Sequence, residues 1–113
     1  MGIELVSKAE ELPATYRDRV REFRRIKASD LKPHPQNWRL HTSAQREALA
    51  GVLEEVGVAD TCVVYESGGQ FIVLDGHLRK DILGNQEVPC VVLDLDDAEA
   101  LKVLATHDAL TGM

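Results

Sequence analysis

Hydrophobic and polar residues follow a helical period in the stretch that runs from Thr42 to Gly57. The apolar residues at the i, i+3, i+4 and i+7 positions are Leu49, Val52, Leu53 and Val56. Thr42 stands three residues before Gln45, which is the spacing of a capping box, and Gly57 is a typical C-terminal stop. The pattern predicts a helix with one buried face.

Two apolar runs further along the chain, residues 61–66 and 70–75, have the length and composition of β-strands. The segment Ser67–Gly69 between them predicts a hairpin turn, because glycine adopts the positive φ angles that such turns require. A third apolar run, residues 88–95, predicts one more strand.

Two short segments outside these runs have the signals of helices. Residues 77–83 predict a helix of about two turns, which Gly84 ends. Asp96 followed by Glu99 predicts the N-terminal cap of a last helix that extends to about His107.

The first third of the chain is less regular. Residues 14–23 predict a helix, and residues 24–28 could continue into a first strand. Residues 29–42 predict a loop, because Pro33 and Pro35 have no backbone N–H and fit neither a helix interior nor a central strand. The order of helices and strands, without an internal repeat, indicates a single α+β domain with a small mixed sheet and flanking helices.

Composition places the chain among ordinary globular proteins. The chain is 44% hydrophobic and 28% charged. Its 113 residues are enough for one hydrophobic core and too few for two domains. No apolar run reaches the roughly 18 residues of a membrane span and no signal peptide is apparent, so we expect a cytoplasmic protein without a membrane partner. Cys62 and Cys90 lie in apolar stretches and are interpreted as core residues.

Charge is distributed unevenly along the chain, whose formal net charge is −6. Residues 14–27 have a local balance of +4, whereas residues 54–113 have a balance of −9. DNA contacts would therefore use the basic segment. Its candidate DNA-binding residues are Arg17, Arg21, Arg24 and Arg25. The alternative is that these arginines only solvate one face of a helix.

The stretch "LDGHLRK" carries the most distinctive chemistry, at the point where a predicted strand meets a predicted helix. Gly76 allows a ligand to approach the backbone, and Arg79 and Lys80 can donate charge-assisted hydrogen bonds to a phosphate or carboxylate. His77 could pair with a phosphate as a cation or act as a general base. An enzyme would also need a second catalytic carboxylate, for which Asp75 and Asp108 are the candidates.

Less specific explanations exist for the same residues. Asp75 and Gly76 could form only a tight turn, with Asp81 paired to a neighbouring arginine. His34 and His41 could be exposed polar loop residues, and Trp38 could cover the core or stack on a base.

Taken together, four stretches resemble the ParB/sulfiredoxin-like domain over about residues 26–108. They are "IKASDLKPHPQNWR", "SAQREALAGVLEEVG", "VVYESGGQFIVLDGHLR" and "LGNQEVPCVVLDLDDAEALKVLAT". The resemblance assigns residues 26–113 to one nucleotide-binding domain and leaves residues 1–25 as a basic helical extension. It implies a nucleoside triphosphate cofactor, CTP or ATP, with or without Mg²⁺.

The resemblance also implies which residues meet the nucleotide. The phosphate site would comprise Gly76, His77, Arg79 and Lys80. The proline-rich loop, with Asn37 and Arg39, would fold over the same pocket. His107 matches a late segment of the family that meets the phosphates, and Asp108 beside it would oppose a triphosphate unless a metal ion bridges the two.

Two classes of function follow from this resemblance. The first is a nucleotide-binding module associated with DNA metabolism, of the partitioning, plasmid, phage or DNA-modification type, with nucleotide and DNA as partners and homodimerisation possible. The alternative is an enzyme of the same fold that uses His77, either a small-molecule kinase or NTPase or a nuclease. Sulfiredoxin activity is excluded, because its nucleophilic cysteine is replaced in the turn by His77.

Overall fold

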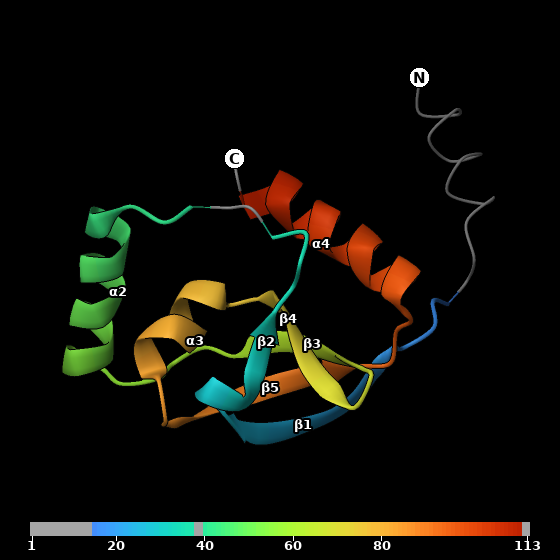
Figure 1. The fold of residues 1–113 in the computed structure, drawn as a ribbon, viewed down its shortest axis with the longest axis horizontal. Helices are drawn as coiled ribbons and strands as arrows, with labels where there is room; N and C mark the ends of the chain where they lie inside the picture. Colours follow the sequence, from blue (N-terminus) through green and yellow to red (C-terminus); the bar gives the residue numbers. More distant parts are fainter. Residues whose placement is uncertain (1–14, 38–39, 112–113) are drawn as a thin grey trace.

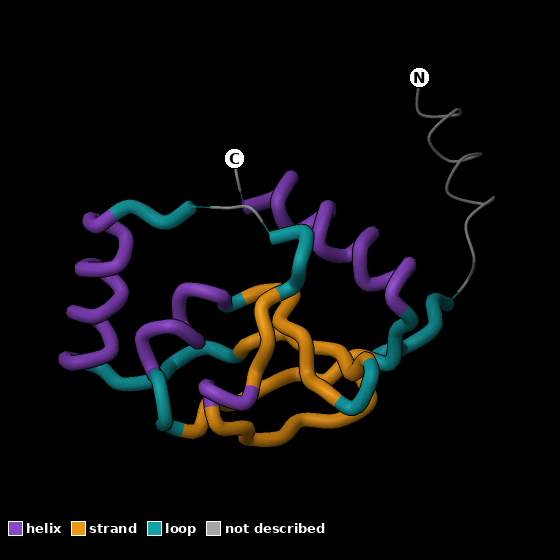
Figure 2. The backbone as a smooth tube through the Cα atoms, in the orientation of Figure 1, coloured by secondary structure: helices purple, strands orange, loops and turns teal. Residues whose placement is uncertain are grey.

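The computed structural model describes residues 15–37 and 40–111, with the side chains of residues 107–111 left out. A five-stranded mixed sheet forms its centre (Figures 1 and 2). In sheet order the strands are β1 (Val20–Lys27), β5 (Glu87–Leu93), β3 (Cys62–Ser67), β4 (Gln70–Asp75) and β2 (Leu31–Pro33). The β1–β5 and β3–β4 pairs are antiparallel, and the β3–β5 and β2–β4 pairs are parallel. The fold is therefore α+β, as the sequence predicts.

Within the described residues, four helical segments accompany the sheet. They are α2 (Ser43–Glu55), α3 (His77–Leu83), α4 (Asp97–Thr111) and a 3-10 turn η1 (Ala28–Asp30). Alternate side chains of the central strands divide the core into two clusters. One contains Val64 and is joined by Leu83 of α3, and the other contains Tyr65 and is joined by Leu104 of α4. Because neighbouring residues of a strand point to opposite faces, α3 and α4 pack on opposite sides of the sheet.

The first strand corrects the expectation for the N-terminal segment. A helix over residues 14–23 is wrong, because Val20–Lys27 forms β1 and pairs with β5 along its length. Glu22, Arg24 and Ile26 lie opposite Val92, Cys90 and Val88. This long-range pairing overrides the local helical pattern. The predicted division between residues 25 and 26 falls inside β1, and residues 1–14 lie outside the described part of the chain.

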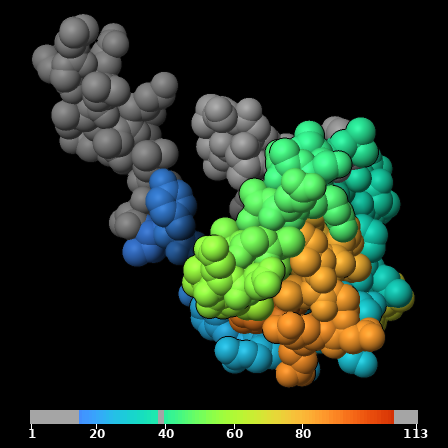
Figure 3. All heavy atoms as spheres, turned by 90° about the vertical axis from the view of Figure 1, so that its left-hand side faces the viewer, coloured from blue at the N-terminus to red at the C-terminus, as the bar shows by residue number. Residues whose placement is uncertain are grey.

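Helix α2 confirms its predicted ends but not its predicted burial. Thr42 and Gln45 exchange both bonds of the capping box, and Gly57 follows the helix with a φ of 101°. No residue of α2 is buried, and Val52 and Val56 are 49% and 71% exposed. Figure 1 shows why: α2 stands beside α3, away from the sheet, so its apolar stripe has only a short helix to pack against. The same helix forms the green ridge at the top of Figure 3.

The remaining elements agree closely with the sequence. The hairpin, α3, β5 and α4 form where they are predicted. The prediction of a loop over residues 29–42 is wrong for its first part, because Leu31–Pro33 forms a short strand, β2, at the edge of the sheet, the position that tolerates a proline. Cys62 and Cys90 are buried in the first cluster, as expected for core residues. In the part of the chain that the structure describes, no helix is long and apolar enough to cross a bilayer.

Candidate functional site

The turn between β4 and α3 is held in a conformation that requires glycine. Gly76 has a φ of 99°, in the left-handed region that side chains disfavour. A Cβ atom at this position would lie 2.7 Å from Cys62 Sγ and 2.8 Å from Arg79 Nη1. The backbone of the turn therefore packs directly on β3 and on the arginine of the first turn of α3.

Arg79 is anchored by two hydrogen bonds on the far side of this turn. Its Nη1 donates to the Thr61 carbonyl at 2.9 Å, and its Nη2 donates to Asp60 Oδ2 at 3.0 Å. The Arg79 side chain is 16% exposed, whereas Asp60 is 71% exposed. The carboxylate of Asp60 thus faces solvent, where another anion can replace it as the partner of Arg79.

The expected partner of an arginine in this turn, Asp81, is replaced by Asp60. Asp81 instead lies 3.8 Å from Lys80, as an ion pair at the surface of α3. Asp60 precedes β3 by two residues and is brought to Arg79 only by the β3–β4 pairing. No local sequence signal predicts this contact, since the two residues are 19 positions apart.

His77 connects the turn to the proline-rich loop. Its Nε2 accepts a hydrogen bond from the His34 backbone N–H at 3.3 Å, and His34 Nδ1 accepts one from the Gln36 N–H at 2.9 Å. His34 is buried, which differs from the exposed loop residue considered from the sequence. Burial lowers the pKa of His77, because the low-dielectric surroundings disfavour the imidazolium. The described part of the loop therefore meets the turn through one imidazole nitrogen, Nε2 of His77, while the His34–Gln36 bond lies within the loop.

A cleft of about 370 Å³ lies on the other side of His34. Its lining residues are His34, Pro35, Gln36, Tyr65, Ser67, Ile72, Asp97 and Leu101. Tyr65 donates its hydroxyl to Asp97 Oδ1 at 2.9 Å, and burial together with this bond raises the pKa of Tyr65 to about 12. Hydrogen bonds from Ser67 and Tyr65 lower the pKa of Asp97, so this carboxylate stays charged.

The other predicted site residues are described only in part. Asp75 is the last residue of β4 and lies opposite Val63, and Asn37 donates its backbone N–H to the His34 carbonyl at 2.9 Å. Arg39 lies outside the described residues. His107 and Asp108 belong to α4, but their side chains are outside the described part. Within the described residues, no group of three or more His, Cys, Asp or Glu side chains is arranged to hold a metal ion.

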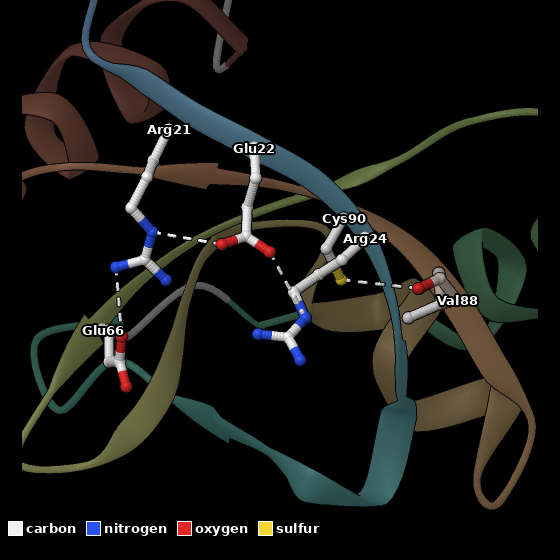
Figure 4. Close-up of polar contacts among 6 residues, drawn as sticks. All are labelled: Arg21, Glu22, Arg24, Glu66, Val88 and Cys90. Atoms are coloured by element: carbon white, nitrogen blue, oxygen red, sulfur yellow. Dashed lines mark hydrogen bonds and ion pairs between the residues drawn. The ribbon is translucent and has the colours of Figure 1, made fainter.

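Two of the candidate DNA-binding arginines lie in a cross-strand network of ion pairs (Figure 4). Arg21 Nη1 is 3.0 Å from Glu66 Oε1, and its Nε is 3.3 Å from Glu22 Oε2. The Nε of Arg24 is 3.5 Å from Glu22 Oε1, and its guanidinium lies 5.2 Å from the centre of the Phe71 ring. The other two, Arg17 and Arg25, are exposed as well, and we refer to these two as the exposed arginine pair.

Comparison with known proteins gives a fold and no closer relationship. No family model matches the chain, and no curated protein matches it either. Among solved structures, the chain is similar to C-terminally truncated ParB from Caulobacter crescentus complexed with CTP-γ-S. The TM-score is 0.66 and the identity 24%, over 79% of this chain and 53% of that chain. The chain thus spans about half the length of that neighbour.

Two further neighbours agree with this fold. Sulfiredoxin from Arabidopsis thaliana matches with a TM-score of 0.61 and 14% identity, over 74% of this chain and 97% of that chain. Caulobacter crescentus ParB complexed to the centromeric parS site matches with a TM-score of 0.56 and 22% identity, over 71% of this chain and 43% of that chain. The chain therefore has the ParB/sulfiredoxin-like fold.

Proposed function

We propose that this chain is a ParB-type nucleotide-binding module that holds the phosphates of a nucleoside triphosphate at the turn around Gly76. The observation that carries the proposal is the glycine turn, packed on β3 beside a mostly buried arginine, in a fold whose neighbour is complexed with CTP-γ-S. CTP is the first candidate ligand because of that neighbour, and ATP is the second.

The proposed phosphate contacts follow from the charges and donors at the turn. The backbone at Gly76 and His77 and the side chains of Arg79 and Lys80 would face the phosphates. Because Asp60 is largely exposed, its ion pair with Arg79 contributes only about 0.2–1 kcal/mol, and a phosphate with more acceptor oxygens can displace it. Asp60 thus acts as a competitor that occupies the guanidinium until the nucleotide arrives.

The nucleotide would also meet residues outside the turn. Asn37 and Arg39 of the proline-rich loop are proposed to cover it, and His107 is proposed to approach the phosphates from α4. Of these, the described part of the loop lies next to the turn, since His34 donates its N–H to His77. Asp108 is proposed to meet the phosphates only through a bridging Mg²⁺, so binding has to be measured with and without magnesium.

The state of His77 supports a binding module over an enzyme. Its Nε2 already accepts a backbone N–H, so the neutral ring carries its proton on Nδ1. In the protein without nucleotide, neither nitrogen is then available as a general base for a hydroxyl nucleophile. The proposed module therefore binds the nucleotide without rapid turnover, and a kinase, NTPase or nuclease that uses His77 and Asp75 is the less supported reading.

DNA is proposed as a second partner, because a neighbour of the same fold is complexed to a centromeric DNA site. On this chain the exposed arginine pair is the better candidate surface. Arg21 and Arg24 are each paired through Nε with Glu22, whose negative charge disfavours a phosphate beside them. Association with plasmid, phage or partitioning processes, like homodimerisation, remains part of this proposal.

Calorimetric titration with CTP, ATP, GTP and ADP, with and without Mg²⁺, tests the proposal. Arg79→Ala should weaken nucleotide binding by roughly 10- to 100-fold, because a charge-assisted phosphate bond contributes about 1.5–3 kcal/mol. The control is Lys102→Ala, which removes the same charge from an exposed position on α4 and should leave affinity unchanged. If the wild-type protein binds none of these nucleotides at millimolar concentration, the proposal is wrong.

A further inference from the structure

Two successive backbone donors of the proline-rich loop are accepted by imidazole nitrogens. The His34 N–H donates to Nε2 of His77, and the Gln36 N–H donates to Nδ1 of His34. An imidazole nitrogen accepts a hydrogen bond only while it carries no proton. Both bonds therefore exist only when the two accepting nitrogens are unprotonated.

We propose that His77 forms a proton-controlled latch that holds residues 34–37 against the Gly76 turn through the backbone N–H of His34, and that phosphate binding at the turn opens it by proton uptake at His77. The part of this inference in which phosphate binding opens the latch rests on the proposed nucleotide site. The latch itself rests only on the two hydrogen bonds and on the burial of His34.

Protonation of His77 would reverse the polarity of the contact. Nε2 would become an N–H donor that faces the N–H donor of His34, and the bond would be replaced by repulsion between like dipoles. The imidazolium could instead donate to a phosphate oxygen of the ligand. The same proton that breaks the contact with the loop thus creates a contact with the nucleotide.

The charges around the rings of His77 and His34 determine when His77 becomes protonated. Asp75 of β4 and Asp81 of α3 favour the cationic form of His77, whereas burial and the neighbouring rings of His34 and His41 disfavour it. His34 in turn packs beside Tyr65 of β3, with ring centres 6.3 Å apart, and interacts with the Asp97 carboxylate of α4. In the free protein the pKa of His77 is held low and the latch is closed. A phosphate near the ring adds negative charge, which raises this pKa and favours opening.

Histidine NMR tests the latch without any nucleotide. Long-range ¹H–¹⁵N spectra of the free protein should show His77 with its proton on Nδ1 at neutral pH. Protection of the His34 amide against hydrogen exchange, corrected for the intrinsic rate, should fall by up to about tenfold per pH unit as the pH drops from the ordinary histidine pKa of about 6.5 towards the lowered pKa of His77. His77→Gln keeps an acceptor of similar reach that does not titrate, so this pH dependence should disappear. His41→Gln is the control and should retain it.

Either of two results would overturn the latch. One is a His77 ring protonated on Nε2 at neutral pH, which cannot accept the His34 N–H. The other is protection of the His34 amide that does not change between about pH 5 and 8, across the range where histidines titrate.

Calorimetry with CTP in two buffers of different ionisation enthalpy tests the coupling. At neutral pH, binding should take up about 0.5–1 proton in the wild type and none in His77→Gln, because only the wild-type side chain can gain one. Binding without proton uptake refutes the coupling and leaves the nucleotide site standing. Failure of CTP and ATP to bind refutes both the proposed function and the coupling, whereas the latch of the free protein is decided by the NMR measurement alone.

Discussion

Replacement of Gly76 by alanine tests how tightly the turn is clamped on the sheet. The new methyl group would meet a backbone φ of 99° and two close atoms, Cys62 Sγ at 2.7 Å and Arg79 Nη1 at 2.8 Å. Gly57 is a matched reference, because its φ is 101° and nothing lies within 4 Å of a Cβ built there. Gly57→Ala therefore carries the conformational strain alone, and Gly76→Ala carries the same strain together with the steric overlap.

The expected magnitudes follow from these two terms. A left-handed alanine costs about 1–2 kcal/mol, and the reduced entropy of the unfolded chain returns about 0.4–1 kcal/mol. Gly57→Ala should thus lower the free energy of unfolding by roughly 0.5–1.5 kcal/mol. Overpacking against β3 adds about 1–3 kcal/mol for Gly76→Ala, since Cys62 is fully buried and cannot rotate into solvent.

Urea unfolding followed by circular dichroism measures both variants, and a double-mutant cycle identifies the obstacle. Cys62→Ala removes Sγ, so in the Gly76→Ala background it should recover about 0.5–2 kcal/mol relative to its own cost in the wild type. Equal destabilisation by the two alanine substitutions, or a coupling energy near zero, would refute the close packing of the turn on Cys62. The m-value should be unchanged if only stability is affected.

Three further results are expected. Asp60→Asn should tighten nucleotide binding about 2- to 5-fold, because it removes the carboxylate that competes with phosphate for the Arg79 guanidinium. The control Asp94→Asn should leave affinity unchanged. Unchanged affinity in Asp60→Asn would contradict the proposal that phosphate displaces Asp60 from Arg79. Arg19, together with the Asp96 backbone N–H, lowers the pKa of Glu99 to about 2. Stability from the Arg19–Glu99 pair should therefore be present above pH 4.5 and lost as pH falls towards 2, and NMR titration should find the pKa of Glu99 higher in Arg19→Gln than in the wild type. DNA affinity should fall with salt concentration, and neutralising the exposed arginine pair should reduce the slope of log affinity against log salt concentration by about one unit per lost contact. An unchanged slope would mean that the pair lies on a solvated surface and does not contact DNA.

Local signals in the sequence were sufficient for those parts of the fold that depend on neighbouring residues. The capping box of α2, the glycine hairpin and the reciprocal bonds between Asp96 and Glu99 are each formed within four residues of the chain. The position of Gly76 at a strand-to-helix turn was predictable for the same reason. Such features are determined before distant segments meet.

Long-range contacts account for what the sequence did not reveal. The arginine-rich segment at Val20–Lys27 becomes a strand only because β5 supplies its hydrogen-bond partners. Asp60 reaches Arg79, and His34 reaches His77, only after the strands have paired, and the second contact joins residues 43 positions apart. The exposure of α2 likewise depends on which element it packs against rather than on its own apolar stripe.

The most direct test of nucleotide binding at the turn is to map backbone amide shifts as CTP is added to the ¹⁵N-labelled protein. The proposal predicts saturable shifts that are largest from Gly76 to Lys80 and in residues 34–37, and that are reduced in Arg79→Ala at the same CTP concentration. Shifts confined to the cleft around Tyr65 and Asp97, or to β1, would place the ligand elsewhere. An unchanged spectrum at millimolar CTP would contradict the account.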